Sequence, residues 1–208
     1  MDIQYYGGNC VKLSTKKATL VIDDNVKALG GSDIAKAGDI VAYTGPVGKA
    51  KDPKFTVARP GNYEIADLSI NGVAARAHMD EEGTSSATMY RVVADDIRVA
   101  VVGHIYPKLT EAQLEDLGII DVLIIPVGGS GFTLDAIGAL EIIKEVDPKI
   151  VIPTNYADSK LNYEVPAASL EDVVKGLGME VKETTSKLKI KGSELLSDQP
   201  QLFVLERQ

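Results

Sequence analysis

The chain has one cysteine, Cys10, two histidines, and fewer positive than negative charges over its 208 residues. A single cysteine cannot form an internal disulfide, and zinc-ribbon sites need several thiolates, so both classes are excluded. Lys and Arg total 22 against 30 Asp and Glu, which gives a formal net charge of −8. Proteins that hold nucleic acid usually carry a basic stripe that displaces counterions, and no run here supplies one. We therefore expect neither nucleic acid nor an anionic membrane as a partner.

Long apolar runs are also absent from the sequence. The longest, residues 119–127, is interrupted by Asp121 and is too short to cross a bilayer. The first residues carry no basic segment followed by an apolar one, as a secretory signal would. These features predict a cytoplasmic protein.

The composition that remains, 45% hydrophobic and 25% charged, is that of a globular protein, and the length favours one domain over residues 1–208. The first half predicts short strands separated by turn-forming residues. We expect strands at residues 2–6, 11–14, 18–23 and 39–44, a short helical segment at 32–37, and two or three strands within 55–77. Residues 89–94 and 97–102 flank Asp95-Asp96, a pattern typical of a hairpin.

The second half alternates buried strands with amphipathic helices. Residues 122–127 and 150–153 are nearly all apolar, which indicates strands buried on both faces, and two further strands are expected at 188–191 and 201–205. Helices are predicted at 110–117, capped by Thr110, at 134–146, capped by Thr133, and at 169–177, ended by Gly178. Strands followed by a strand–helix–strand succession predict an α/β fold in layers.

Five predicted apolar strands end abruptly in a polar residue or a turn. The residues at these ends are Asp23, Thr44, His104, Gly128 and Asn155. Ligands of layered α/β folds tend to bind beyond the carboxyl ends of strands, so we expect Asp23, His104, Asn155 and the loop after Thr44 to share one rim of the molecule. The alternative for each of them is an ordinary transition from strand to turn.

Several segments resemble the metallo-β-lactamase fold superfamily, in its compact lactonase-like branch. They are Gly7-Gly8-Asn9-Cys10 followed by residues 20–23, Pro60-Gly61-Asn62-Tyr63-Glu64, residues 121–135 and residues 148–153. The resemblance covers nearly the whole chain. It implies a four-layer αββα sandwich with a metal site at the rim where the two sheets meet.

The metal-binding positions of that family differ here. The family's His-x-His-x-Asp-His motif follows the strand at 39–44, where this chain reads Thr44-Gly45-Pro46-Val47-Gly48-Lys49. The family's Gly-Asp corresponds to Gly103-His104, and its final ligand histidine corresponds to Asn155. His78 falls where relatives keep a ligand histidine.

These departures favour a catalytically inactive or metal-independent hydrolase homologue that serves as a binding module, without a cofactor. Its expected partners are a small molecule or a protein, with a homo-oligomer as a possibility. The candidate residues of the ligand rim are His78, Asp80, His104, Asn155, Asp158 and Lys49. A lysine after Thr44, Lys49 or Lys51, could supply the positive charge of a missing cation and hold an anionic ligand.

Two other functions stay open. One is a hydrolase of esters, lactones or phosphoesters with a single divalent ion, zinc or manganese, held by His78, His104 and a carboxylate such as Asp80 or Asp158. The other is a metal-free enzyme with His104 as general base and the Gly128-Gly129 amides as an anion cradle. The alternative to all three functions is that each of these residues has a purely structural role.

Overall fold

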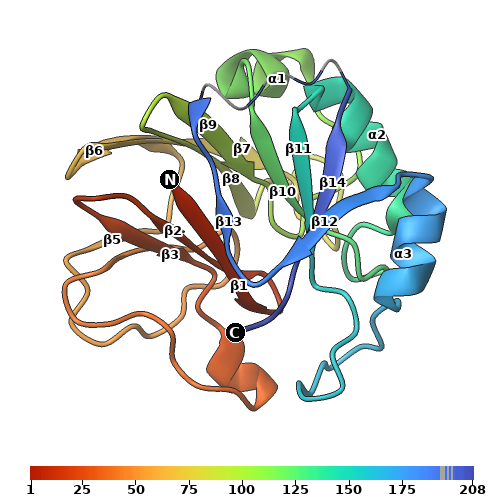
Figure 1. Ribbon diagram of the computed structural model, residues 1–208, viewed down its shortest axis with the longest axis horizontal. Helices are drawn as coiled ribbons and strands as arrows, with labels where there is room; N and C mark the ends of the chain where they lie inside the picture. The colour runs from red at the N-terminus through yellow and green to blue at the C-terminus, as the bar shows by residue number, and fades with distance from the viewer. Residues whose placement is uncertain (193–194, 196, 198) are drawn as a thin grey trace.

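In the computed structural model, which describes residues 1–192, 195, 197 and 199–208, the first five strands and one late strand form a six-stranded sheet (Figure 1). Its strand order is β13-β1-β2-β3-β4-β5. The bounds are β1 (Asp2–Gly7), β2 (Cys10–Ser14), β3 (Thr19–Ile22), β4 (Ile40–Ala42), β5 (Phe55–Val57) and β13 (Leu188–Lys189). Alternate residues of β1 point into the core, as the period of a half-buried strand requires.

The remaining strands form an eight-stranded sheet of order β12-β14-β11-β10-β9-β8-β7-β6. The bounds are β6 (Gly61–Ile65), β7 (Leu68–Ala75), β8 (Ala87–Ala94), β9 (Ile97–Val101), β10 (Val122–Pro126), β11 (Ile150–Thr154), β12 (Val181–Thr185) and β14 (Gln201–Leu205). The hairpin is confirmed: β8 and β9 meet at Asp95 and Asp96, whose φ angles of 51° and 60° suit a two-residue turn. β10 and β11 are parallel and fully buried, as their apolar sequences predict.

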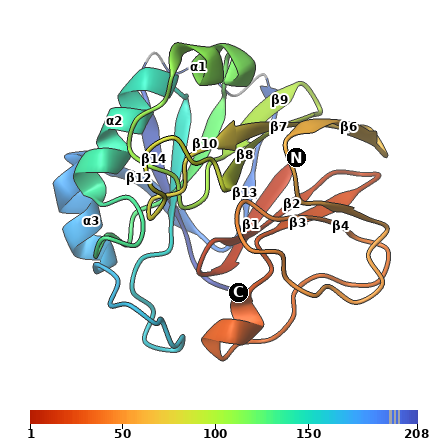
Figure 2. The same cartoon turned by 180° about the vertical axis from the view of Figure 1, so that it is seen from behind.

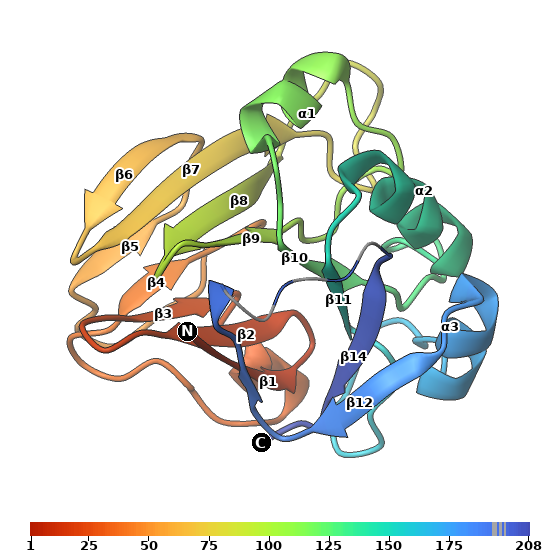
Figure 3. The ribbon, with the colours of Figure 1, turned by 45° about the horizontal axis from the view of Figure 1, so that its top comes forward.

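Three helices lie along the outer side of the eight-stranded sheet (Figure 3): α1 (Glu111–Leu117), α2 (Ala136–Val146) and α3 (Leu170–Leu177). The Thr110 cap of α1 and the Gly178 end of α3 are confirmed. The expected start of α2 is wrong by two residues. Asp135 caps this helix by accepting a hydrogen bond from the Gly138 N–H at 2.8 Å, and Thr133 does not.

Among the residues that the structure describes, the outer side of the six-stranded sheet carries a short 3-10 helix, η1 (Val26–Leu29), and loops (Figure 2). Val26 and Leu161 pack there against Cys10 and Val21. The expected helical segment at residues 32–37 is wrong, because the Asp24 carboxylate accepts hydrogen bonds from the Ile34 and Ala35 N–H groups and holds that segment as a loop. The α/β sandwich of the metallo-β-lactamase type is confirmed, with this outer layer the thinner of the two.

One apolar core lies between the sheets. It includes Leu13 and Ile22 from the six-stranded sheet, and Met89 and Val99 from the eight-stranded sheet, all at most 1% exposed. Burial of each such side chain contributes about 1.5–3 kcal/mol. The search for helices able to span a membrane found none in the described part of the chain.

The two sheets are tied together at one rim of the sandwich. The Thr88 N–H donates to the Thr44 carbonyl at 2.8 Å, and the Asn155 N–H donates to the Gly8 carbonyl at 2.7 Å. The Tyr90 hydroxyl donates to the Tyr43 carbonyl at 3.0 Å. These contacts fix the ends of β4 and β11 relative to each other, and this is the rim at which the candidate site lies.

Candidate ligand pocket

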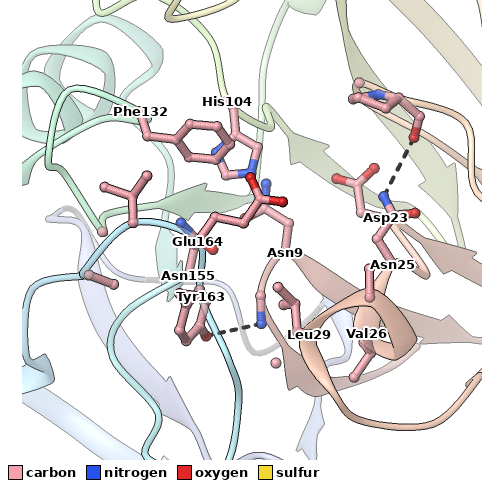
Figure 4. A pocket seen from close by; sticks show the side chains of 18 of the residues that line it. Asn9, Asp23, Asn25, Val26, Leu29, His104, Phe132, Asn155, Tyr163 and Glu164 are labelled. Carbon is pink, nitrogen blue, oxygen red and sulfur yellow. Dashed lines mark hydrogen bonds between the residues drawn. The ribbon is translucent and has the colours of Figure 1, made fainter.

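A cavity of about 390 Å³ opens at this rim, where β3, β4, β9, β10 and β11 end (Figure 4). Its lining includes Asp23, Thr44, His104, Gly128 and Asn155. The structure therefore brings together Asp23, His104, Asn155 and the loop after Thr44, as the sequence predicted, and adds Gly128 to them. The volume lies in the range of small-molecule sites, about 300–1,000 Å³.

Asp23 follows β3 in a left-handed conformation, with φ of 56°. Its carboxylate accepts two hydrogen bonds from Thr44, one from the N–H at 2.7 Å and one from the hydroxyl at 2.6 Å. The residue is 6% exposed, and burial raises the pKa of its carboxyl to about 6. No ion pair to Asp23 occurs among the described residues.

His104 follows β9 and faces Phe132, with 5.0 Å between the ring centroids. Its Nδ1 atom is buried and has no hydrogen-bond partner in the described part of the chain. Burial, with a smaller effect from nearby His78, lowers the pKa of the His104 imidazole to about 4. The ring is therefore neutral at pH 7, and one polar atom of the pocket wall is unsatisfied.

Asn9 and Asn155, two of the three asparagines that line the cavity, add amide groups to its wall. The Asn9 Oδ1 atom accepts a hydrogen bond from the Thr154 hydroxyl at 2.8 Å, which leaves the buried Asn9 Nδ2 atom without a partner among the described residues. Asn155 has a left-handed φ of 56°. A Cβ atom at Gly128 would lie 2.3 Å from the Asn155 carbonyl oxygen, so only glycine fits beside it.

The other walls come from loops. Val26 and Leu29 line one side, and Phe132, Tyr163 and Val165 line another. The Tyr163 hydroxyl accepts a hydrogen bond from the Gly8 N–H at 3.3 Å, which holds this distant loop against the turn between β1 and β2 (Figure 4). The aromatic residues could not be predicted from the sequence because these loops carry no periodic pattern. Asn9 was not predicted either, although its position in the turn Gly7-Gly8-Asn9 could have indicated that it lies at the pocket.

Of the six candidate rim residues, His104 and Asn155 line the cavity, and His78, Asp80, Asp158 and Lys49 are not among the lining residues described. The His78 N–H donates to the His104 carbonyl at 2.8 Å, and its Nδ1 lies 3.3 Å from the Ile105 carbonyl oxygen. Lys49 is exposed. A role for these four residues in ligand binding stays a prediction.

The two remaining acidic candidates are engaged elsewhere. The Asp80 carboxylate accepts hydrogen bonds from the Ala77 N–H and from the N–H and hydroxyl of Ser86, which close its own turn. These bonds lower the pKa of the Asp80 carboxyl. Asp158 forms an ion pair with Arg207.

The donor groups of the pocket do not match a catalytic zinc site. Such a site takes about three His, Cys, Asp or Glu ligands and an open position. Among the described residues no group of three or more of these side chains could hold a metal ion. At the cavity itself the candidate ligands are one imidazole, the amides of Asn9, Asn25 and Asn155, the exposed Glu164, and the Asp23 carboxylate, whose oxygens already accept from Thr44.

Known proteins resemble this chain in sequence and in fold. Residues 2–155 match the family described as "Beta-lactamase superfamily domain". The chain belongs to the metallo-β-lactamase superfamily. A search of curated proteins found no match.

Several solved structures share the fold over nearly the whole chain. A proposed Zn-dependent hydrolase of this superfamily from Thermotoga maritima is 23% identical, with a TM-score of 0.75 and 99% of each chain covered. A metallo hydrolase from Ignicoccus hospitalis is 15% identical, with a TM-score of 0.62, covering 99% of this chain and 94% of the other. A proposed metal-dependent hydrolase from Parabacteroides distasonis is 15% identical, with a TM-score of 0.66 and coverages of 99% and 93%. At these identities the likeness shows the fold.

Proposed function

We propose that this metallo-β-lactamase-fold protein binds a small molecule in the rim pocket without a resident metal ion, and that it acts as a binding module rather than a hydrolase. The observation that carries the proposal is the set of polar groups at the cavity: a single imidazole, three asparagine amides, the exposed Glu164, and an Asp23 carboxylate already bonded to Thr44. Two of these side chains have buried polar atoms without partners, which a ligand could satisfy.

The packing of the sandwich supports such a role, because burial of apolar side chains is the main source of a fold's stability. The apolar core extends through both sheets, and the loop after β4 is fixed by Asp23 and by the contact of Thr44 with Thr88. A pocket formed in this way keeps its shape without an ion at its centre.

The metal content of the purified protein tests the first part of the proposal. We expect elemental analysis of protein prepared without chelator to give far less than one zinc, manganese or iron ion per chain. We also expect a chelator to leave the melting temperature unchanged. Stoichiometric, tightly bound metal would overturn the proposal.

A single-ion hydrolase centred on His78 and His104 is the second candidate. It is favoured by the backbone contact that brings these two residues together and by the hydrolase descriptions of the structural relatives. In that case His78→Gln and His104→Gln would each abolish metal uptake and any esterase, lactonase or phosphoesterase turnover. If turnover is found and both variants keep it, this candidate is excluded.

Blocking the pocket tests the binding role. Ala28 lines the cavity and is exposed, so Ala28→Trp places a large ring at its mouth without disturbing the core. Lys27→Trp places the same ring on the neighbouring exposed residue outside the lining and serves as the control. We expect only Ala28→Trp to abolish the binding of small molecules that shift the His104 ring signals in NMR spectra.

A further inference from the structure

The charged side chains that line the pocket are all acidic. Asp23 and Glu164 are the charged residues of the described lining, and no Lys or Arg belongs to it. His104, the remaining group that could carry a positive charge, is held neutral by its burial. The cavity therefore presents negative charge and no positive charge to a ligand.

The buried negative charge of Asp23 is only partly compensated. Its carboxylate is 6% exposed and has no cationic partner in the part of the chain that the structure describes. A buried carboxylate costs free energy unless a cation or several hydrogen bonds compensate it. Two hydrogen bonds from Thr44 compensate it in part. A positive group inside the cavity would complete the compensation.

The remaining walls suit an organic cation better than an inorganic one. Phe132 and Tyr163 contribute aromatic rings, and Val26 and Leu29 contribute apolar surface. Figure 4 shows Asp23 on one side of the cavity and Phe132 and Tyr163 on the other, with Glu164 near the rings in this view. Aromatic faces attract ammonium groups, and apolar side chains cover the carbon part of such a ligand.

We propose that the ligand of this pocket is a small organic ammonium ion with an apolar body, and that the pocket rejects carboxylates and phosphates. This inference rests on the proposed binding function and gives the chemical class of its ligand. It replaces the anionic ligand that a lysine after Thr44 would have favoured, because Lys49 and Lys51 are exposed and neither is part of the described lining. The net charge of −8 also steers cations toward the molecule.

Three probes of the same shape and different charge test the proposal: 2-phenylethylammonium, 2-phenylethanol and phenylacetate. The protein has two histidines, so the ring signals of His104 can be assigned with the His104→Gln variant and followed in NMR titrations. We expect the ammonium ion to shift the His104 signals and to bind at least about tenfold more tightly than the alcohol. We expect phenylacetate to cause no shift.

Two variants assign the charge selection to the lining. Glu164→Gln changes an exposed residue and leaves the fold intact, and Asp23→Asn removes the buried charge. Each should weaken binding of the ammonium ion several-fold more than it weakens binding of the alcohol. Glu180→Gln removes an exposed charge outside the described lining and should change neither.

The outcomes separate this inference from the proposed function. Equal binding of ammonium and alcohol, or tighter binding of phenylacetate, overturns the cation preference while the pocket remains a binding site. Ammonium binding that survives both Glu164→Gln and Asp23→Asn also overturns it. If no probe shifts the His104 signals and the purified protein holds stoichiometric metal, the proposed function fails as well.

Discussion

Burial acts in opposite directions on the two titratable groups at the centre of the pocket. For the His104 imidazole it lowers the pKa to about 4, and for the Asp23 carboxyl it raises the pKa to about 6. In both residues burial disfavours the charged form. Acidification therefore changes the folding stability through these two residues with opposite signs.

For His104, the unfolded chain binds a proton below about pH 6.5 and the folded chain does so only near pH 4. The free energy of unfolding should therefore fall as the pH is lowered through this window, by about 1.4 kcal/mol for each pKa unit of difference. Urea unfolding of the wild type and of His104→Gln between pH 4 and 7.5 measures this effect. We expect the wild type to lose stability relative to the variant on acidification. A pH-independent difference would contradict the buried, neutral imidazole.

For Asp23, the folded chain binds a proton near pH 6 and the unfolded chain only near pH 3.8. Lowering the pH through this window should therefore stabilise the wild type relative to Asp23→Asn, whose amide does not titrate. The same unfolding series measures it, with Asp67→Asn as an exposed control. A wild type that loses stability relative to Asp23→Asn between pH 6 and 4 would show that the carboxylate is not buried as described.

Some residues of the pocket could be predicted from the sequence, and others could not. Asp23, His104 and Asn155 could be predicted because the ends of neighbouring strands meet at one edge of a sheet, a regularity that the sequence pattern carries. Phe132 and Tyr163 could not, because each lies in a loop whose position depends on distant contacts, such as that of Tyr163 with Gly8. Asp80 and Asp158 were proposed on proximity in the sequence and are bonded elsewhere in the structure.

At the scale of single elements, substitutions can test which residue caps the start of α2. Asp135 accepts the Gly138 N–H, whereas the Thr133 hydroxyl is buried without a partner among the described residues. Asp135→Ala should cost about 1 kcal/mol of unfolding free energy, since a capping bond is lost. Thr133→Val should cost nothing or stabilise, because it replaces an unpaired buried hydroxyl by a methyl group of the same shape.

Chemical denaturation of both variants compares these effects. Equal losses from the two substitutions would mean that Thr133 contributes to the cap. The sequence predicted Thr133 as the cap because it directly precedes the apolar repeat, whereas the fully buried Leu134 lies ahead of the helix in the structure and Asp135 is the cap.

Other elements show where local patterns fail. β12 was missed because its residues are mostly polar and exposed, as is usual for a strand at the edge of a sheet. Residues 32–37 were expected to be helical, and the carboxylate of Asp24 holds them in a loop instead. The strands with strictly apolar sequences, β10 and β11, were predicted within one residue of their observed ends, because burial on both faces leaves little choice of residue.

At the scale of the whole molecule, segments far apart in the sequence meet beside the pocket. Arg207 follows β14 and pairs in a bridge with Tyr5 of β1, and the Gln208 N–H donates to the Tyr5 carbonyl at 3.0 Å. Arg207 also forms its ion pair with Asp158, which lies in the loop after β11. These contacts connect the two sheets, and no local sequence pattern could have predicted them.

The ion pair of Arg207 and Asp158 is partly buried, with side chains 23% and 17% exposed, whereas that of Lys27 and Asp33 is 71% and 50% exposed. Arg207→Ala leaves a half-buried carboxylate unpaired and should lower the unfolding free energy by about 1–3 kcal/mol. Lys27→Ala should cost a few tenths of a kcal/mol at most, since exposed pairs contribute about 0–1 kcal/mol. Double-mutant cycles on the two pairs, measured at low and high salt, separate the coupling from other losses. Equal coupling energies in the two cycles would mean that Asp158 does not depend on Arg207, and Asp158 would then again be a candidate for binding a ligand or an ion.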